Sequence, residues 1–179
     1  HINISPILGG LNQFFVNNNK NFDTAIVATS TDSLMDNLLL LLRNGFKKIL
    51  IEKPAAISID ELIANHKEIS SFKSKIFVAY NRRFFNSIKE VKKIIENDGG
   101  LQSMFFEFTE WIHLIEKIDK VEENKNLFFV NSTHVIDLAF FIAGKPTKWE
   151  TFTKKGEIDW HPISQFSGSG ITDKNVLFF

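Results

Sequence analysis

Residues 49–54, with the sequence ILIEKP, constrain the fold because they combine a buried strand with a charged ending. The three apolar residues are typical of a parallel strand that is buried on both faces. Two charges and Pro54 follow at once, and a proline favours extended backbone in the residue before it, here Lys53. Ser58 and Glu61 then form a capping box, which predicts the start of a helix. The charged loop is therefore expected at the carboxyl edge of a sheet, where open α/β sheets bind their ligands.

A similar unit precedes this one. Residues 24–28 (TAIVA) predict a buried strand, and the small polar residues Thr29 and Ser30 follow it. Leucines recur at helical spacing over residues 34–42, and Gly45 is placed to end that helix. Strand, helix and strand together make a βαβ unit with a parallel sheet.

A third strand is expected over residues 76–79, and it also ends in polar groups, Asn81 and Arg82 among them. Arg82 and its neighbour could bind a phosphate or a carboxylate, or could be surface charge beside a helix. A helix follows, and the double glycine that ends it marks a change in composition. We place a domain boundary near Gly99, which divides the chain into residues 1–98 and 99–179.

The second part of the chain has a different pattern. Imperfect alternation with many aromatic residues over residues 101–110 predicts a half-buried antiparallel strand, and further strands are expected from residue 149 onward. Residues 131–143 predict a helix that carries His134 and Asp137 three residues apart on one face. Such a pair is typical either of a hydrogen bond on a helix or of half a metal site. No third ligand is in view, so no metal is expected.

Composition excludes several classes of protein. Hydrophobic residues make up 44% of the 179 residues, which is enough for a sizeable core. Basic and acidic residues both number 21, so the chain lacks the charge expected of a partner of nucleic acid or of an anionic membrane. The absence of cysteine excludes disulfides and thiolate metal sites, and it fits a cytoplasmic location.

Taken in order, the segments FDTAIVATS, ILIEKP, FVAYNRRF and HVIDL with IAG resemble the glucose-fructose oxidoreductase, inositol dehydrogenase and MocA family. The resemblance covers residues 22–144. It implies an α/β fold, with a partial Rossmann-type parallel sheet followed by part of an α+β domain that has a mainly antiparallel sheet. Residues 1–98 would be the C-terminal part of the nucleotide-binding domain, and residues 99–179 part of the domain for substrate binding and oligomerisation.

The resemblance also implies an activity. Members of the family oxidise or reduce sugars, cyclitols and related compounds with NAD or NADP. The expected reaction is hydride transfer between nicotinamide and a hydroxyl or carbonyl of a sugar, cyclitol or sugar nucleotide. Members commonly form homo-oligomers through the open face of the second sheet, so a homo-oligomer is expected.

Site residues follow by the same resemblance. Lys53 would contact both the substrate and the nicotinamide ribose, and His134 would lie near the reacting hydroxyl; both are expected to be catalytic. Lys53 would supply a positive group near oxygen, and His134 would be the base that takes the proton. The residues expected to bind the cofactor are Thr29, Ser30, Glu52, Lys53 and Pro54, and those expected to bind the substrate are Asn81, Arg82, Asn131 and His134.

The sequence departs from the family in three respects. The glycine-rich first turn has no counterpart, which implies a piece that begins midway through the Rossmann domain, ends midway through the second sheet and is inactive alone. Val130 stands four residues before His134, where many members carry an aspartate, so a proton relay through that aspartate is not expected. Ser30 replaces a common proline.

Two alternatives to a sugar dehydrogenase stay open. The first is a binding or assembly module of the same fold without activity, to which the missing glycine turn and Val130 point. The second is a reductase that acts on a non-sugar ligand. A site lined by hydroxyl and amide groups would favour a sugar, whereas an aromatic lining would favour the reductase.

Overall fold

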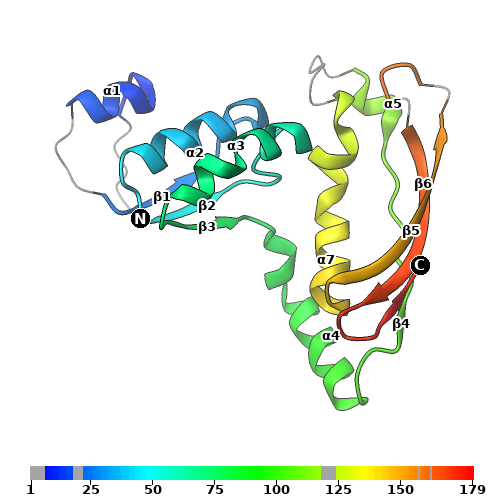
Figure 1. Ribbon diagram of the computed structural model, residues 1–179. Coiled ribbons are helices and arrows are strands. Elements are labelled where there is room, and N and C mark those ends of the chain that lie inside the picture. The colour runs from blue at the N-terminus through cyan, green and yellow to red at the C-terminus, as the bar shows by residue number, and fades with distance from the viewer. Residues whose placement is uncertain (1–6, 18–21, 118–123, 157, 162) are drawn as a thin grey trace.

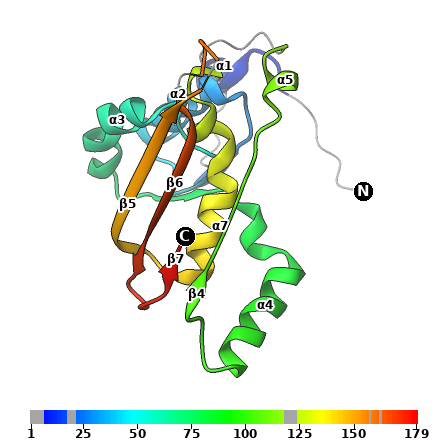
Figure 2. The same ribbon diagram turned by 90° about the vertical axis from the view of Figure 1, so that its right-hand side faces the viewer.

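Two separate sheets and the helices that cover them make up the structure, a computed structural model that describes residues 7–17, 22–117, 124–156, 158–161 and 163–179. The parallel sheet and helices α1 to α3 lie at one side of Figure 1, and the second sheet lies at the other. Helix α7 runs between them, alongside the second sheet (Figure 2). Within the described residues, no helix combines the length and the apolar character needed to cross a membrane.

The first sheet is parallel throughout, with strand order β1 (Thr24–Val27), β2 (Lys48–Ile51) and β3 (Lys75–Val78). The crossover helices α2 (Leu34–Arg43) and α3 (Ile59–Ser71) lie on the same side of it (Figure 1). Each connection is strand, helix, strand, as the apolar runs and helical spacing predicted.

One face of this sheet carries the core. Ile49 and Ile51 are fully buried against α2, where Leu42 is 1% exposed. The other face is not covered by the described residues: Leu50 is 39% exposed and lies in register with Ile26 on β1 and Phe77 on β3. The expectation that residues 49–51 are buried on both faces is therefore wrong for Leu50, because the described helices cover one face only.

Short elements surround this sheet. Helix α1 (Gly10–Asn17) packs against the core through Phe15. The ring of Phe15 meets that of Phe46 edge-on, with the centroids 6.0 Å apart. The 3-10 turn η1 (Thr31–Ser33) leads into α2, and the turn η2 (Asn81–Phe84) leads from β3 into α4 (Asn86–Asn97). Polar residues that follow β1 and β3 are thus held in compact turns.

The second sheet has strand order β4, β7, β6, β5. Strands β5 (Pro146–Lys155) and β6 (Ile163–Thr172) form a long antiparallel pair, and β7 (Leu177–Phe178) is antiparallel to β6. The antiparallel strand expected over residues 101–110 is wrong in extent and direction, since only β4 (Ser103–Met104) forms and it runs parallel to β7. Its partner strand has only two residues, so the ladder has nothing further to pair with.

Helix α7 (Thr133–Ala143) packs on this sheet through Phe140, whose ring contacts that of Phe178 with centroids 5.0 Å apart. It ends at Gly144, whose φ of 99° lies in the region that favours glycine. The sequence predicted one helix over residues 131–143, but the first two of these residues belong to a π-helical turn, η3 (Phe128–Ser132). A short helix, α5 (Ile112–Ile115), lies earlier in the chain. The domain boundary near Gly99 stays a prediction.

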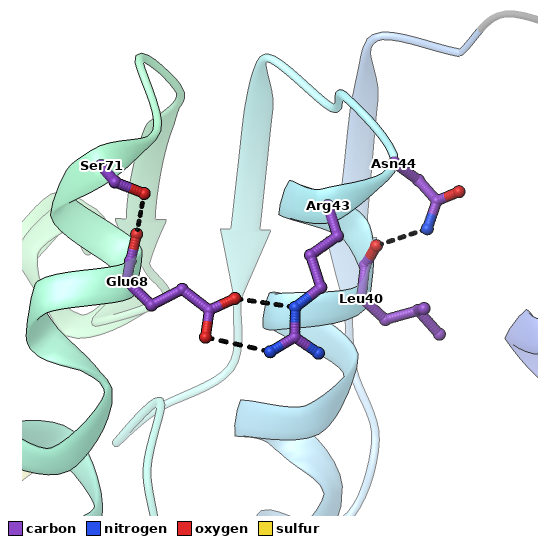
Figure 3. A network of polar contacts seen from close by, with 5 residues as sticks. All are labelled: Leu40, Arg43, Asn44, Glu68 and Ser71. Atoms are coloured by element: carbon purple, nitrogen blue, oxygen red, sulfur yellow. Dashed lines mark hydrogen bonds and ion pairs between the residues drawn. The ribbon is translucent and has the colours of Figure 1, made fainter.

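Helices α2 and α3 are also joined across their surfaces (Figure 3). Arg43 donates from Nε to Oε1 of Glu68 over 2.7 Å and from Nη2 to Oε2 over 2.9 Å. The hydrogen bond from Arg43 lowers the pKa of the Glu68 carboxyl. Both side chains are well exposed, so this pair orients the helices more than it stabilises them.

We expect Ser58→Ala to lower the free energy of unfolding by about 1 kcal/mol, because it removes a helix cap. The Glu61 amide donates to Ser58 Oγ over 3.2 Å, and Glu61 Oε2 accepts from the Ile57 amide over 2.6 Å. Urea unfolding measures the effect. Ser70→Ala, an exposed change within the same helix, is the control and should cost much less. Equal losses in the two variants would show that the cap contributes nothing.

Candidate active site

The carboxyl ends of the three parallel strands meet at one edge of the sheet. The amide of Glu52 donates to the carbonyl of Val27 over 2.9 Å, and the amide of Ala79 donates to the carbonyl of Ile51 over 2.8 Å. The pairing therefore continues to the last residue of each strand. Every polar loop that the sequence singled out begins at this edge.

Lys53 lies in a tight turn after β2. The amide of Ala55 donates to the carbonyl of Glu52 over 3.0 Å, and Ala55 has a φ of 73°. Left-handed backbone costs a non-glycine residue about 1 kcal/mol, so local strain is accepted in this turn. The half-buried side chain of Lys53 crosses to the other part of the molecule, where Nζ donates to the carbonyl of Val130 over 2.8 Å.

His134 stands in the first turn of α7, near the lysine. Burial lowers the pKa of its imidazole, and the positive charges of Lys53 and Arg82 lower that pKa further. The carboxylates of Glu52 and Asp137 oppose this lowering. The ring is therefore neutral at pH 7 and able to accept a proton.

One ring nitrogen of His134 is left without a partner. Its Nδ1 is buried and makes no hydrogen bond to the described residues. The ring of Tyr80 meets the imidazole edge-on, with the centroids 5.9 Å apart. Burial raises the pKa of the Tyr80 hydroxyl. A buried polar atom without a partner is unfavourable by about 1 to 3 kcal/mol, and the described residues do not offset this cost at Nδ1.

Asp137 is engaged by an arginine. Arg83 donates from Nε to Asp137 Oδ2 over 2.7 Å and from Nη2 to Oδ1, which joins η2 to α7. The guanidinium also lies over the ring of Phe141, 5.1 Å from its centroid. The carboxylate of the His134 and Asp137 pair is thus engaged by Arg83. Across the described ranges, no three His, Asp or Glu side chains are placed to hold a metal ion.

The remaining candidate residues differ in how they are placed. Thr29 Oγ1 accepts from Asn37 over 3.3 Å, and the hydroxyl of Ser30 donates to Asp32, so both side chains contact α2 or its lead-in. Pro54 is buried, whereas Asn81 is exposed at the start of η2. The amide of Asn131 donates to Glu110. The structure thus brings Lys53, Arg82 and His134 together, while the binding roles of the whole set stay predictions.

Sequence reasoning missed three contributors to this region. Tyr80 packs on His134, the carbonyl of Val130 receives the lysine, and Glu110 accepts from both Asn131 and Ser132. The Val130 contact links residues 77 positions apart, and it uses a backbone atom, which no residue type reveals. Tyr80 is next to the expected Asn81 and Val130 is next to the expected Asn131, whereas Glu110 stood near no motif.

The donors at this edge fit the nicotinamide end of a dinucleotide. Hydroxyls follow β1, an ammonium follows β2, and a guanidinium follows β3. The imidazole of His134 lies close to this ammonium and this guanidinium. A glycine-rich turn for the diphosphate is not found in the sequence.

We expect the free energy of unfolding to fall as the pH drops from about 7 to about 5. Burial lowers the pKa of both His134 and His161, so the folded chain binds fewer protons than the unfolded chain below the ordinary histidine value near 6.5. Each histidine contributes a slope of at most about 1.4 kcal/mol per pH unit. Urea unfolding at several pH values should show a shallower slope in His134→Gln and in His161→Gln. Slopes equal to that of the unchanged chain would contradict this account.

Comparison with known proteins identifies the relatives of this arrangement. The sequence is 27% identical over 137 residues to inositol 2-dehydrogenase of Rhizobium meliloti (strain 1021), an alignment that covers 76% of this chain and 41% of that protein. The chain is thus similar in sequence to an inositol dehydrogenase. The resemblance inferred from its sequence is confirmed. No protein-family model matches the chain.

Solved structures show the same fold. Myo-inositol 2-dehydrogenase from Lactobacillus plantarum superposes with a TM-score of 0.66 at 18% identity, over 89% of this chain and 50% of that one. The WlbA dehydrogenase from Bordetella pertussis, in complex with NADH and UDP-GlcNAcA, superposes with a TM-score of 0.69 at 16% identity, over 96% of this chain and 51% of that one. The expected α/β class is confirmed, and the chain spans about 40 to 50% of the length of these proteins, with 41%, 50% and 51% covered in the three comparisons.

Proposed function

We propose that this chain carries the nicotinamide and substrate end of a cytoplasmic NAD(P)-dependent oxidoreductase that acts on a sugar, a cyclitol or a sugar nucleotide. The observation that carries the proposal is the meeting of Lys53, Arg82 and His134 beside the carboxyl ends of the parallel strands. Ligands of open α/β sheets bind at that edge. The related inositol 2-dehydrogenase supports the activity class.

In this proposal the two catalytic side chains act on one oxygen of the substrate. As the hydroxyl proton leaves, negative charge develops on the carbinol oxygen, and the Lys53 ammonium stabilises that charge. His134, neutral at pH 7, takes this proton, and the carbon–oxygen bond becomes a carbonyl as the carbon gives up its hydride. A nicotinamide held beside these residues would supply the hydride acceptor. Positioned acid–base groups of this kind accelerate reactions by about 10² to 10⁴-fold.

The other expected residues have binding roles in this proposal. Thr29, Ser30, Glu52 and Pro54 would line the nicotinamide end, because they follow β1 and β2 at the same edge. Asn81 and Arg82 would contact the substrate from η2. Asn131 would contact it through its amide oxygen, since its amide nitrogen donates to Glu110. NAD and NADP are both compatible with these residues.

We also propose that the open face of the second sheet joins copies of the protein into a homo-oligomer. Phe152 on β5 and Leu177 on β7 share the face of the sheet that is opposite to Phe178, and they are 64% and 47% exposed. The sheet-on-sheet contact would cover them. Sedimentation of the chain and of Phe152→Glu measures this, and a monomer in both cases would contradict it.

Calorimetric titration with NADH and NADPH tests the proposed function. The samples are this chain, a version extended upstream in its reading frame, and both with Lys53→Ala; Lys48→Ala, an exposed lysine on the same strand, is the matched control. We expect the extended protein to bind NADH or NADPH, with an affinity that Lys48→Ala leaves unchanged. In a rate assay we expect no turnover of a sugar by this chain alone. An extended protein that binds neither nucleotide would contradict the oxidoreductase and favour a module without activity. Turnover of apolar carbonyl compounds but of no sugar would favour a reductase of a non-sugar ligand.

A further inference from the structure

Lys53 depends for its position on a turn that belongs to the other part of the molecule. Its ammonium donates to the carbonyl of Val130, which lies within the π-helical turn η3. An ammonium has three donors, and a carbonyl oxygen has two lone pairs, so this bond can form beside the bonds of the helix itself. Any movement of η3 therefore moves the acceptor that holds the lysine.

The position of η3 is fixed by Glu110, which lies in the segment after β4. One carboxylate oxygen accepts from the side-chain amide of Asn131, and the other accepts from the hydroxyl of Ser132. These two residues directly follow Val130. Ser132 is 2% exposed, so its bond to a carboxylate is sheltered from water.

The charge of Glu110 suits this place. Both oxygens of its carboxylate accept hydrogen bonds from side chains of η3. Hydrogen bonds to a carboxylate are stronger than bonds between neutral groups. One acidic side chain thus binds two consecutive residues of this turn.

We propose that Glu110 is a positioning residue that sets the place of Lys53 through the turn η3. It acts through Asn131 and Ser132 on the carbonyl of Val130, and it does not touch the reacting atoms. This inference rests on the proposed function for its importance to catalysis. The coupling itself is a property of this chain without any nucleotide.

Nitrogen-15 NMR of lysine ammonium groups tests the coupling in the full chain. The Lys53 signal is assigned by its loss in Lys53→Ala, and the exchange of its hydrogens with water is then measured in Glu110→Ala. We expect exchange at least about tenfold faster, the change that matches loss of one charge-assisted hydrogen bond. Glu107→Ala, an exposed glutamate on the same segment, is the matched control and should leave exchange unchanged.

A conservative variant separates positioning from general loss of structure. Glu110→Gln keeps the shape and one acceptor oxygen, so we expect it to fold and to show an intermediate exchange rate. Ser132→Ala removes one donor and should act in the same direction. If Glu110→Ala folds, an unchanged exchange rate of the Lys53 ammonium in it would overturn the proposal. If Glu110→Ala does not fold, unchanged rates in both Glu110→Gln and Ser132→Ala would overturn it.

The two proposals fail in different measurements. If the extended protein binds no nucleotide but Glu110→Ala still speeds the exchange of the Lys53 ammonium, the proposed function is contradicted and the coupling is supported. Nucleotide binding and turnover with no effect of Glu110 on Lys53 would remove the coupling and leave the function.

Discussion

Lys53→Ala is expected to lower turnover of the upstream-extended protein by at least about 100-fold, with a much smaller change in the affinity for NADH. In the proposed reaction the lysine is the positive group that faces the oxygen on which charge develops, and that charge exists only in the transition state. The side chain is held there by its bond to the Val130 carbonyl. Steady-state rates with myo-inositol and a panel of sugars, beside calorimetric nucleotide affinities, measure both quantities.

Lys48→Ala serves as the control for this experiment. It removes the same charge from the other end of β2, where the side chain is exposed. We expect turnover to stay within about twofold of the unchanged protein, since a solvated charge at that distance is screened. Equal losses of turnover in the two variants would mean that Lys53 acts through net charge and not at the reacting oxygen.

Ile49→Ala is expected to lower the free energy of unfolding by about 2 to 5 kcal/mol. Ile49 is fully buried on the central strand of the parallel sheet, against α2, so its truncation leaves a cavity in the main core. Chemical denaturation monitored by circular dichroism measures the loss. A marginal domain can lose most of its stability this way, so Ile49→Val, with an expected loss of about 1 kcal/mol, gives a second value.

Leu50→Ala is the matched control on the same strand. Leu50 points to the opposite face and is 39% exposed, so its truncation should cost less than about 1 kcal/mol. A loss as large as that of Ile49→Ala would mean that another part of the protein covers this face, together with Ile26 and Phe77.

The parallel sheet could be predicted from local sequence because its signals are local. Each strand is a short apolar run, each helix has its own spacing, and Ser58 and Gly45 mark a start and an end that the structure confirms. The exposure of Leu50 could not be predicted, because it depends on whether a second layer covers that face of the sheet. The short extent of β4 could not be predicted for a similar reason. Its length is set by the two residues of β7, which lie far along the chain.

The candidate site was predictable in its residue types and much less so in its contacts. Lys53 and His134 stood in recognisable motifs, and the structure brings the two side chains close to each other. The bonds that fix them involve a backbone carbonyl, a π-helical turn and a glutamate more than 20 positions from its partners. Hydrogen bonds between distant segments leave no spacing pattern, so only the fold reveals them.

Transfer of deuterium is the most direct test of the proposed reaction. The upstream-extended protein is incubated with NAD⁺ or NADP⁺ and with sugars and cyclitols that carry deuterium on the carbinol carbon, and the reduced nucleotide is analysed by mass spectrometry. We expect deuterium in the nicotinamide with at least one substrate, and its loss in Lys53→Ala but not in Lys48→Ala. Nucleotide binding without transfer from any substrate, or transfer that is unaffected by Lys53→Ala, would contradict the account.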